Sequence, residues 1–139
     1  MSDDVDYAAW NAWVVGEFRA NGGAVPGYET MPVLLLTTTG ATSGEPRLVP
    51  LVYVPDGDRY LVFAVNSGRP YEPAWYRNLL ADPHATVEVE DATFAVVARV
   101  AEGDEHDDLW AKCLSAQPSY HAYVADRQVP AVVLEPVSG

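Results

Sequence analysis

The stretch that decides the fold is PVLLLTTTGATSGEPRLVPLVYV, residues 32–54. Its first part, residues 32–39, is an apolar run that ends in threonines, and this predicts a buried strand. Residues 47–54 are rich in apolar and β-branched side chains and predict a second strand. Within that strand Pro50 cannot donate a ladder hydrogen bond, so it should mark a sheet edge or a bulge. Between the strands, the small residues 40–45 predict a loop with glycine hinges.

The rest of the chain repeats the strand pattern in short segments. Residues 84–90 alternate between apolar and polar side chains, which predicts a strand with one buried face. The run Pro55-Asp56-Gly57-Asp58 predicts the turn of a hairpin. We therefore expect one domain over residues 1–139 that is mainly β with flanking helices (α+β), a six-stranded antiparallel barrel. The expected strands are 32–39, 47–54, 59–65, 84–90, 93–100 and 129–136, and the expected helices are about 4–21, 73–83 and 104–116, with a short helix or tight turn at 119–127.

The N-terminal helix has an aromatic face. Trp10, Trp13, Val14 and Phe18 fall at helical spacing, and Asn21-Gly22-Gly23 predicts the end of the helix. We expect the two tryptophans to dock on the core. A peripheral contact with a membrane surface is the alternative, but the polar face carries aspartates rather than the lysines that such helices use.

Charge and apolar runs exclude several classes of function. The chain has 8 Lys and Arg against 20 Asp and Glu, a net charge of -12, whereas nucleic acids and anionic membranes require a basic footprint. No apolar run approaches the roughly 20 residues of a membrane-spanning helix, so we expect no integral membrane segment. The first residues include Asp3 and Asp4 instead of a basic region, so we expect no signal peptide.

Cysteine and histidine usage predicts a reducing compartment and no metal. The single cysteine, Cys113, cannot form an internal disulfide, which favours the cytoplasm. His84, His106 and His121 are scattered and too few, with one cysteine, for a zinc site. We interpret all three histidines as surface or turn residues.

The loop after residue 39 can hold an anion. Backbone N–H groups between glycines can cradle a phosphate or a carboxylate, and Arg47 adds a charged fork at the end of the loop. The alternative is a plain connection between two strands, in which Arg47 is a solvated surface group. The residue pattern alone leaves both interpretations open.

Two further segments carry candidate groups. The segment AVNSGRPYEPAW leads from a strand past Arg69 into a helix, whose N-terminus is a natural anion site. The alternative for Trp75 in that helix is core packing. Tyr120 and Tyr123 share a face if their segment is helical, and their phenols could donate a hydrogen bond or a proton to a bound carbonyl. The alternative is a pair of half-buried surface aromatics.

Taken together, these segments resemble a known family. EFRANGG, LLLTTTGATSGEPR, a proline in the next strand, DGDRYLVFA, NSG, PAWYRNLLADP and VPAVVLEP stand in the order found in the deazaflavin-dependent nitroreductase family. The resemblance runs from about Asn11 to Pro136. Members are split β-barrel oxidoreductases, related to FMN-binding reductases, that use coenzyme F420, an 8-hydroxy-5-deazaflavin.

The resemblance implies a function and a set of site residues. The reduced deazaflavin would donate a hydride to an apolar, conjugated acceptor such as a quinone, an enone or a nitroaromatic. A homodimer is compatible with this family. The implied residues are, for the phosphate and polyglutamate tail, Ala41, Thr42, Ser43, Gly44 and Arg47; for the deazaflavin, Pro50, Leu51, Ala64, Val65, Asn66, Ser67, Gly68, Trp75 and Asn78; and for catalysis near the acceptor, Tyr120 and Tyr123.

The chain departs from the family pattern at four positions. Many members carry Lys or Arg at the position of Thr42, and a basic or neutral residue at the position of Glu45. Some carry Lys at the position of Asn66. Val65 replaces a Ser found in some members, which argues against nitroreduction. Two alternatives stay open: a split barrel that binds FMN through its single phosphate, and a member that holds a lipid or another apolar ligand without turnover.

Overall fold

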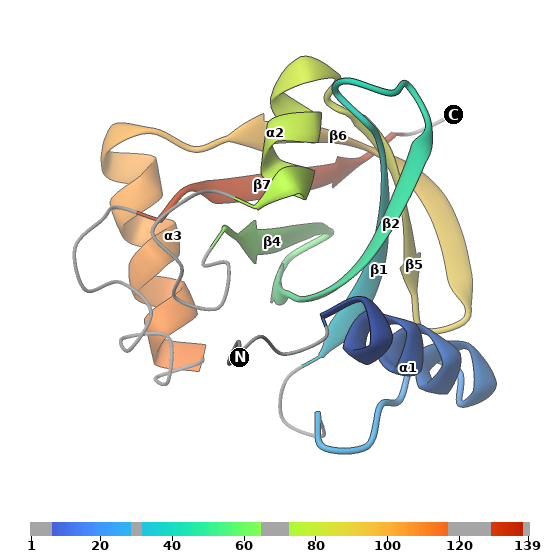
Figure 1. Cartoon of the computed structure of the whole chain (residues 1–139). Helices are drawn as coiled ribbons and strands as arrows, with labels where there is room; N and C mark the ends of the chain where they lie inside the picture. The colour runs from blue at the N-terminus through green and yellow to red at the C-terminus, as the bar shows by residue number, and fades with distance from the viewer. Residues whose placement is uncertain (1–6, 29–31, 65–72, 117–128, 138–139) are drawn as a thin grey trace, which may run out of the picture.

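The computed structural model describes residues 7–28, 32–64, 73–116 and 129–137 (Figure 1). Within these ranges the chain forms a curled antiparallel sheet with helices packed around it. The helices are α1 Tyr7–Ala20, α2 Ala74–Ala81 and α3 Gly103–Ala116, and the strands are β1 Val33–Thr39, β2 Pro46–Val52, β3 Val54–Asp56, β4 Arg59–Phe63, β5 His84–Val89, β6 Ala92–Val100 and β7 Ala131–Pro136. The predicted class, mainly β with flanking helices, is confirmed.

The strand order requires the sheet to curl. The order is β2-β1-β5-β6-β7-β4-β3, and each neighbouring pair is antiparallel. β2 and β3 lie at opposite ends of this order, yet only Tyr53 separates them in the chain. Two residue steps span at most about 7 Å, so the two ends of the sheet must approach each other. The result is the rounded, barrel-like sheet of Figure 1.

The predicted number of strands was wrong: the described residues form seven strands, not six. The expected strand 47–54 is divided at Tyr53 into β2, which pairs with β1, and β3, which pairs with β4. The Tyr53 amide donates to the Pro32 carbonyl at 3.0 Å before the chain changes partner. The apolar pattern continues across this point, so periodicity could not reveal the exchange. The hairpin turn that follows is confirmed, with Gly57 at a φ of 65°.

The position of Pro50 in the sheet is confirmed as an edge. β2 is the terminal strand in the order, so a residue without an N–H breaks no ladder on its open side. Pro50 pairs with Leu35. Because residues paired across strands share a face, Pro50 points to the same face as Leu35, and its neighbours Val49 and Leu51 point to the opposite one.

Three groups of buried side chains hold the fold together. The largest fills the inside of the curled sheet, beneath α2. The other two lie on the outer face, one under α3 and one under α1. The inner cluster includes Leu34, Leu36, Val62, Ala64, Trp75, Leu79, Val87, Val96, Val132 and Leu134. Each fully buried Leu or Val contributes about 1.5–3 kcal/mol, so the inner cluster is the main source of stability.

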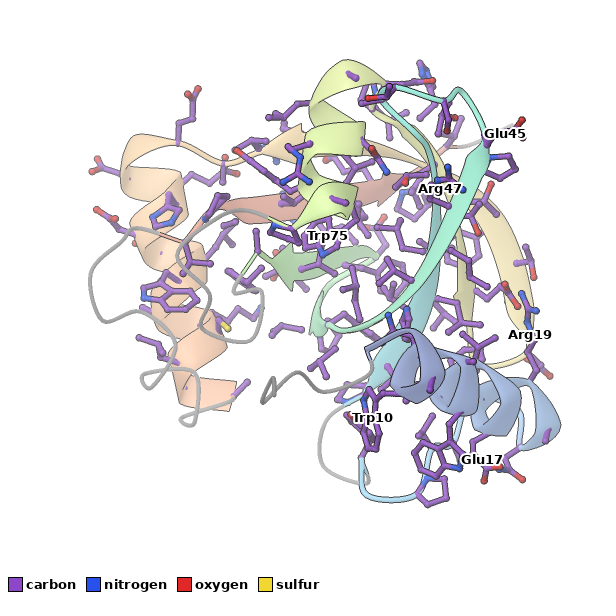
Figure 2. The ribbon with its side chains drawn as sticks, in the orientation of Figure 1. Trp10, Glu17, Arg19, Glu45, Arg47 and Trp75 are labelled. Atoms are coloured by element: carbon purple, nitrogen blue, oxygen red, sulfur yellow. The ribbon has the colours of Figure 1, made fainter. Side chains whose placement is uncertain are left out.

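The predicted docking of the α1 tryptophans on the core was wrong. Val14 and Phe18 are each 2% exposed and pack on the sheet, whereas Trp10 is 46% and Trp13 42% exposed. Their ring centroids lie 5.2 Å apart, and Trp10 lies 6.4 Å from Tyr28. Figure 2 shows Trp10 on the side of α1 that faces away from the sheet. The buried side chains of Val14 and Phe18, and not the two indole rings, therefore fix the helix to the sheet.

The predicted end of α1 is confirmed and has a physical cause. The Gly23 amide donates to the Phe18 carbonyl at 2.8 Å, and Gly22 has a φ of 63°. This is the hydrogen bond of a Schellman motif, in which a glycine in the left-handed region closes the helix.

Among the described residues, none of the helices has the length and apolar composition that crossing a bilayer requires.

The interpretation of His106 as a surface residue was also wrong. It is buried, and its Nε2 lies 2.6 Å from the Val129 carbonyl oxygen, which ties α3 to the segment entering β7. His84 is exposed, as expected, and His121 lies outside the described residues. Cys113 lies on the buried face of α3, and this burial raises the pKa of its thiol to about 12, so it stays protonated.

Candidate functional site

The loop between β1 and β2 is closed by its own backbone. The Gly40 amide donates to the Glu45 carbonyl at 2.8 Å, and the Gly44 amide donates to the Gly40 carbonyl at 2.9 Å. Gly44 has a φ of 71°, which favours glycine. A Cβ on Gly40 would lie 2.6 Å from Ser43 Oγ. Both glycines are therefore required by the compact shape of this loop.

The loop leaves two neighbouring amides available. Four of its six backbone N–H groups have protein partners: those of Gly40 and Gly44, and those of Ala41 and Glu45, which donate to side chains. In the part of the chain that the structure describes, the amides of Thr42 and Ser43 have no such partner, and both residues are exposed. Two successive N–H groups in a tight turn form a site that attracts anions.

Arg47 lies beside these amides. Its Nη2 donates to Ser43 Oγ at 3.1 Å, and the Glu45 amide donates to the same oxygen at 3.1 Å. A hydroxyl that accepts two hydrogen bonds keeps its hydrogen for a further acceptor. Arg47 pairs with Thr38 across the strands and so lies on the inner face of the sheet, while Glu45 points outward in Figure 2.

Asn78, on α2, lies beneath the loop. Its Oδ1 accepts from the Ala41 amide at 3.0 Å, and its Nδ2 donates to Thr38 Oγ1 at 3.0 Å. Asn78 is 7% exposed and Thr38 is 2% exposed. This buried amide therefore joins a helix, a strand and the loop, and both of its ends are occupied by protein groups.

The residues expected at the ring lie apart from the loop, on the inner face. Ala64 and Trp75 belong to the inner core cluster, and Leu51 packs against it. Trp75 is 7% exposed, and in Figure 2 it lies below α2, toward the sheet. The structure thus confirms that Trp75 packs in the core. A role of Trp75 beside a ligand stays a prediction. The side chain of Pro50 lies on the outer face.

The structure brings part of the expected site together. Ala41, Thr42, Ser43, Gly44, Arg47 and Asn78 lie in one place at the rim of the sheet. Leu51, Ala64 and Trp75 share the inner cluster. Outside the described residues are Val65, Asn66, Ser67, Gly68, Tyr120 and Tyr123.

Sequence reasoning missed Thr38, and it identified Gly40 as a hinge without its second role. Thr38 receives the Asn78 side chain, and Gly40 leaves room for the Ser43 hydroxyl. A signal for Thr38 existed: it is in phase with Leu34 and Leu36 on the strand, so the period of two places it on the inner face. The role of Gly40 depends on a contact that only the folded loop creates.

A cavity of about 710 Å³ lies elsewhere, at the connection between α1 and β1. It is lined by residues of the segment 21–28 together with Tyr53 and Glu90, and it contains none of the expected site residues. The pKa of the Tyr53 phenol is raised, mainly by burial and then by the nearby Glu90 and Tyr60, so the phenol stays neutral.

Among the described residues, no group of three or more metal-ligating side chains is present.

Fold and site together define a small, mainly β protein with a candidate anion site at the rim of a curled antiparallel sheet. Residues 11–136 match the family described as F420H(2)-dependent quinone reductase. The chain therefore belongs to the F420H(2)-dependent quinone reductase family.

Individual relatives agree with this membership. An F420H(2)-dependent quinone reductase of Mycobacterium tuberculosis (strain ATCC 25618 / H37Rv) is 41% identical over 91 residues. The match covers 64% of this chain and 60% of that protein, so it spans less than two thirds of the relative's length.

Two solved structures share the fold at similar identity. A structure of an F420-H2 dependent reductase (FDR-A) is 37% identical, with a TM-score of 0.69 over 75% of this chain and 94% of that one. A second, described as a domain-swapped dimer, is 33% identical, with a TM-score of 0.70 over 92% of this chain and 98% of that one.

Proposed function

We propose that this chain is a split-barrel reductase that binds reduced coenzyme F420 and passes a hydride to an electrophilic acceptor of the quinone class. The observation that carries the proposal is the β1–β2 loop, in which the free amides of Thr42 and Ser43 lie beside Arg47. Family membership supports the choice of coenzyme. When bound, the reduced deazaflavin supplies the hydride, and the protein supplies position and electrostatics.

The donors present suit the anionic part of this coenzyme. Its phosphate and the carboxylates of its polyglutamate tail carry only acceptor oxygens, and the loop offers two amides, the Ser43 hydroxyl and the Arg47 guanidinium. Hydrogen bonds between a charged donor and a charged acceptor contribute about 1.5–3 kcal/mol each. Because the net charge of the chain is -12, such local donors are needed to bring a polyanion to its surface.

The inner face beside α2 suits the ring. Leu51, which is only partly buried, supplies apolar surface there, on the face that carries Arg47 and backed by the buried Ala64 and Trp75. We propose that this surface, together with residues 65–68, lines the deazaflavin, and that Pro50, whose side chain lies on the outer face, contributes only its backbone. Tyr120 and Tyr123 would lie near the acceptor as hydrogen-bond or proton donors. An apolar, conjugated acceptor fits a face of this composition.

Binding and turnover test the proposal directly. We expect coenzyme F420 to bind the purified protein in a fluorescence titration, and its reduced form to be oxidised when a quinone is added. The same assay with an enone and a nitroaromatic compares the three acceptor classes, and Val65 leads us to expect the weakest activity on the nitroaromatic. Absence of coenzyme binding at tens of micromolar would contradict the proposal.

The same preparation separates the alternatives. A yellow, flavin-like spectrum that survives dialysis would indicate FMN. A fatty acid extracted at near one-to-one occupancy, without coenzyme binding, would indicate a holder of apolar ligands.

Assembly and location are part of the proposal. A homodimer is supported by the related structure that is described as a domain-swapped dimer. Light scattering coupled to size-exclusion chromatography tests it, and a single mass near 15.1 kDa would contradict it. A cytoplasmic location, with or without a peripheral membrane contact, is tested by cell fractionation.

A further inference from the structure

We propose that Asn78 is a positioning residue for the coenzyme tail: it holds the β1–β2 loop in the shape that presents the Thr42 and Ser43 amides, and does not itself contact the coenzyme. The proposal rests on the proposed function and assigns Asn78 a different role from the one that the family resemblance implies, a place at the edge of the deazaflavin.

The hydrogen bonds of Asn78 point to this role. Its Oδ1 accepts from the Ala41 amide and its Nδ2 donates to Thr38 Oγ1, both at 3.0 Å. The residue is 7% exposed, so little of the amide is accessible to a ligand. Ala41 directly precedes the two free amides, so a bond that holds the Gly40–Ala41 peptide restrains the start of the segment that presents them.

The loop needs such an anchor because its own bonds act only at its ends. Gly40 bonds to Glu45 and Gly44 bonds to Gly40, but in the described chain the Ala41 amide is held by Asn78 alone. Glycine-rich segments lose more conformational freedom than others when they become ordered. A loop that is already ordered in the free protein does not lose that freedom when the ligand binds.

The anchor is itself rigid. α2 carries Asn78 between Trp75 and Leu79, which are both buried in the inner cluster. Trp75 lies three residues before Asn78 and so on the same side of the helix. The helix therefore connects the surface proposed for the ring to the loop proposed for the tail.

The decisive experiment compares two ligands: intact coenzyme F420, and its deazariboflavin, which lacks the phosphate and the tail. In Asn78→Leu, which removes both hydrogen bonds, we expect the intact coenzyme to bind about 3- to 10-fold more weakly. We expect the deazariboflavin to bind as it does to the wild type, and turnover at saturating coenzyme to be unchanged. Equal weakening for both ligands would place Asn78 at the ring and overturn the proposal, and so would no weakening for either.

Two variants control for unrelated damage. Thr38→Val removes the bond between Asn78 and β1 but keeps the bond to Ala41, so we expect intact-coenzyme affinity close to that of the wild type. Asn78→Ala, which also removes both hydrogen bonds, replaces Asn78→Leu if that variant does not fold. It should weaken binding of the intact coenzyme and spare the deazariboflavin.

Hydrogen exchange in the free protein adds a measurement that needs no coenzyme. We expect the Ala41 amide to exchange faster in Asn78→Leu than in Thr38→Val. If exchange changes as expected but the wild type binds neither ligand, Asn78 does hold the loop, but the proposed function is wrong. In that case the proposed role of Asn78 toward the coenzyme is wrong as well. If the Ala41 amide exchanges at the same rate in all variants, Asn78 does not hold the loop and the proposal is overturned.

Discussion

Ser43 shows how single groups decide what the loop can hold. Its hydroxyl oxygen accepts from the Glu45 amide and from Arg47 Nη2, which directs the guanidinium toward the loop and leaves the hydroxyl hydrogen for a ligand. One cation, one hydroxyl and two amides thus meet at a rim of a strongly acidic protein. The local arrangement of donors, and not the net charge, determines whether this surface can bind an anion.

Arg47→Ala should weaken coenzyme binding roughly 10- to 150-fold, because it removes a charge-assisted hydrogen bond worth about 1.5–3 kcal/mol. Turnover at saturating coenzyme should change little, since the tail is remote from the hydride. Raised salt should weaken binding to the wild type more than to the variant, because screening acts on a charge that the variant lacks. Fluorescence titrations at two salt concentrations measure both effects.

Arg19→Ala is the matched control for this prediction. Arg19 lies on α1 and pairs with Glu88 at 2.7 Å, so the variant loses the same charge elsewhere on the surface. It should bind the coenzyme as the wild type does. Equal affinities and equal salt dependence for Arg47→Ala and wild type would mean that the loop is only a connection.

α1 illustrates, at the level of elements, that burial rather than size decides what stabilises a helix. Phe18→Ala should cost about 3–5 kcal/mol of unfolding free energy, because a fully buried ring is replaced by a cavity. Trp13→Ala should cost less than about 1 kcal/mol, because much of that ring is already in water. Urea denaturation measures both. A Trp13→Ala cost equal to that of Phe18→Ala would show that the tryptophans dock on the core after all.

The contact between α3 and the β3–β4 hairpin should depend on pH. Lys112 donates to Asp56 Oδ1 at 2.5 Å and Arg59 to Oδ2 at 2.8 Å, and these bonds, that of Lys112 foremost, hold the pKa of Asp56 below its usual range. A carboxyl with a lowered pKa in the folded state stabilises the fold above its unfolded pKa, about 3.9, and loses that contribution as the pH falls through the folded value.

Asp56→Asn should therefore destabilise the protein at neutral pH by about 0.2–1 kcal/mol, as partly exposed ion pairs do, and the difference from wild type should vanish once the pH falls below the lowered pKa of Asp56. Asp58→Asn, an exposed carboxylate in the same turn, is the control for the change in net charge. Denaturant unfolding at several pH values gives the comparison. A difference that persists unchanged in acid would exclude this ion pair as its cause.

For the molecule as a whole, local pattern predicted the elements but not their partners. The strand at residues 84–90 follows from side-chain alternation and the C-terminal end of α1 from glycine, and both act within a few residues. The exchange of partners at Tyr53 does not, because the apolar pattern is the same on both sides of it. The curl that brings the ends of the sheet together was therefore visible only in the structure.

The site shows the same division. The glycine hinges and Arg47 could be identified because they lie within eight residues of one another. The role of Asn78 could not, because its partner Ala41 is 37 residues away and only the packing of α2 on the sheet brings them together. His106 was misjudged for a similar reason: its partner, the Val129 carbonyl, is 23 residues away.

We propose above all that the β1–β2 loop binds the anionic tail of the coenzyme. The most direct measurement is a titration of the isotope-labelled protein with coenzyme F420, followed by amide NMR. We predict that the largest early shifts occur at the amides of Thr42 and Ser43 and at Arg47 Nε, and that the exposed indoles of Trp10 and Trp13 do not respond. Binding that leaves the Thr42 and Ser43 amides unchanged while other resonances shift would contradict the claim.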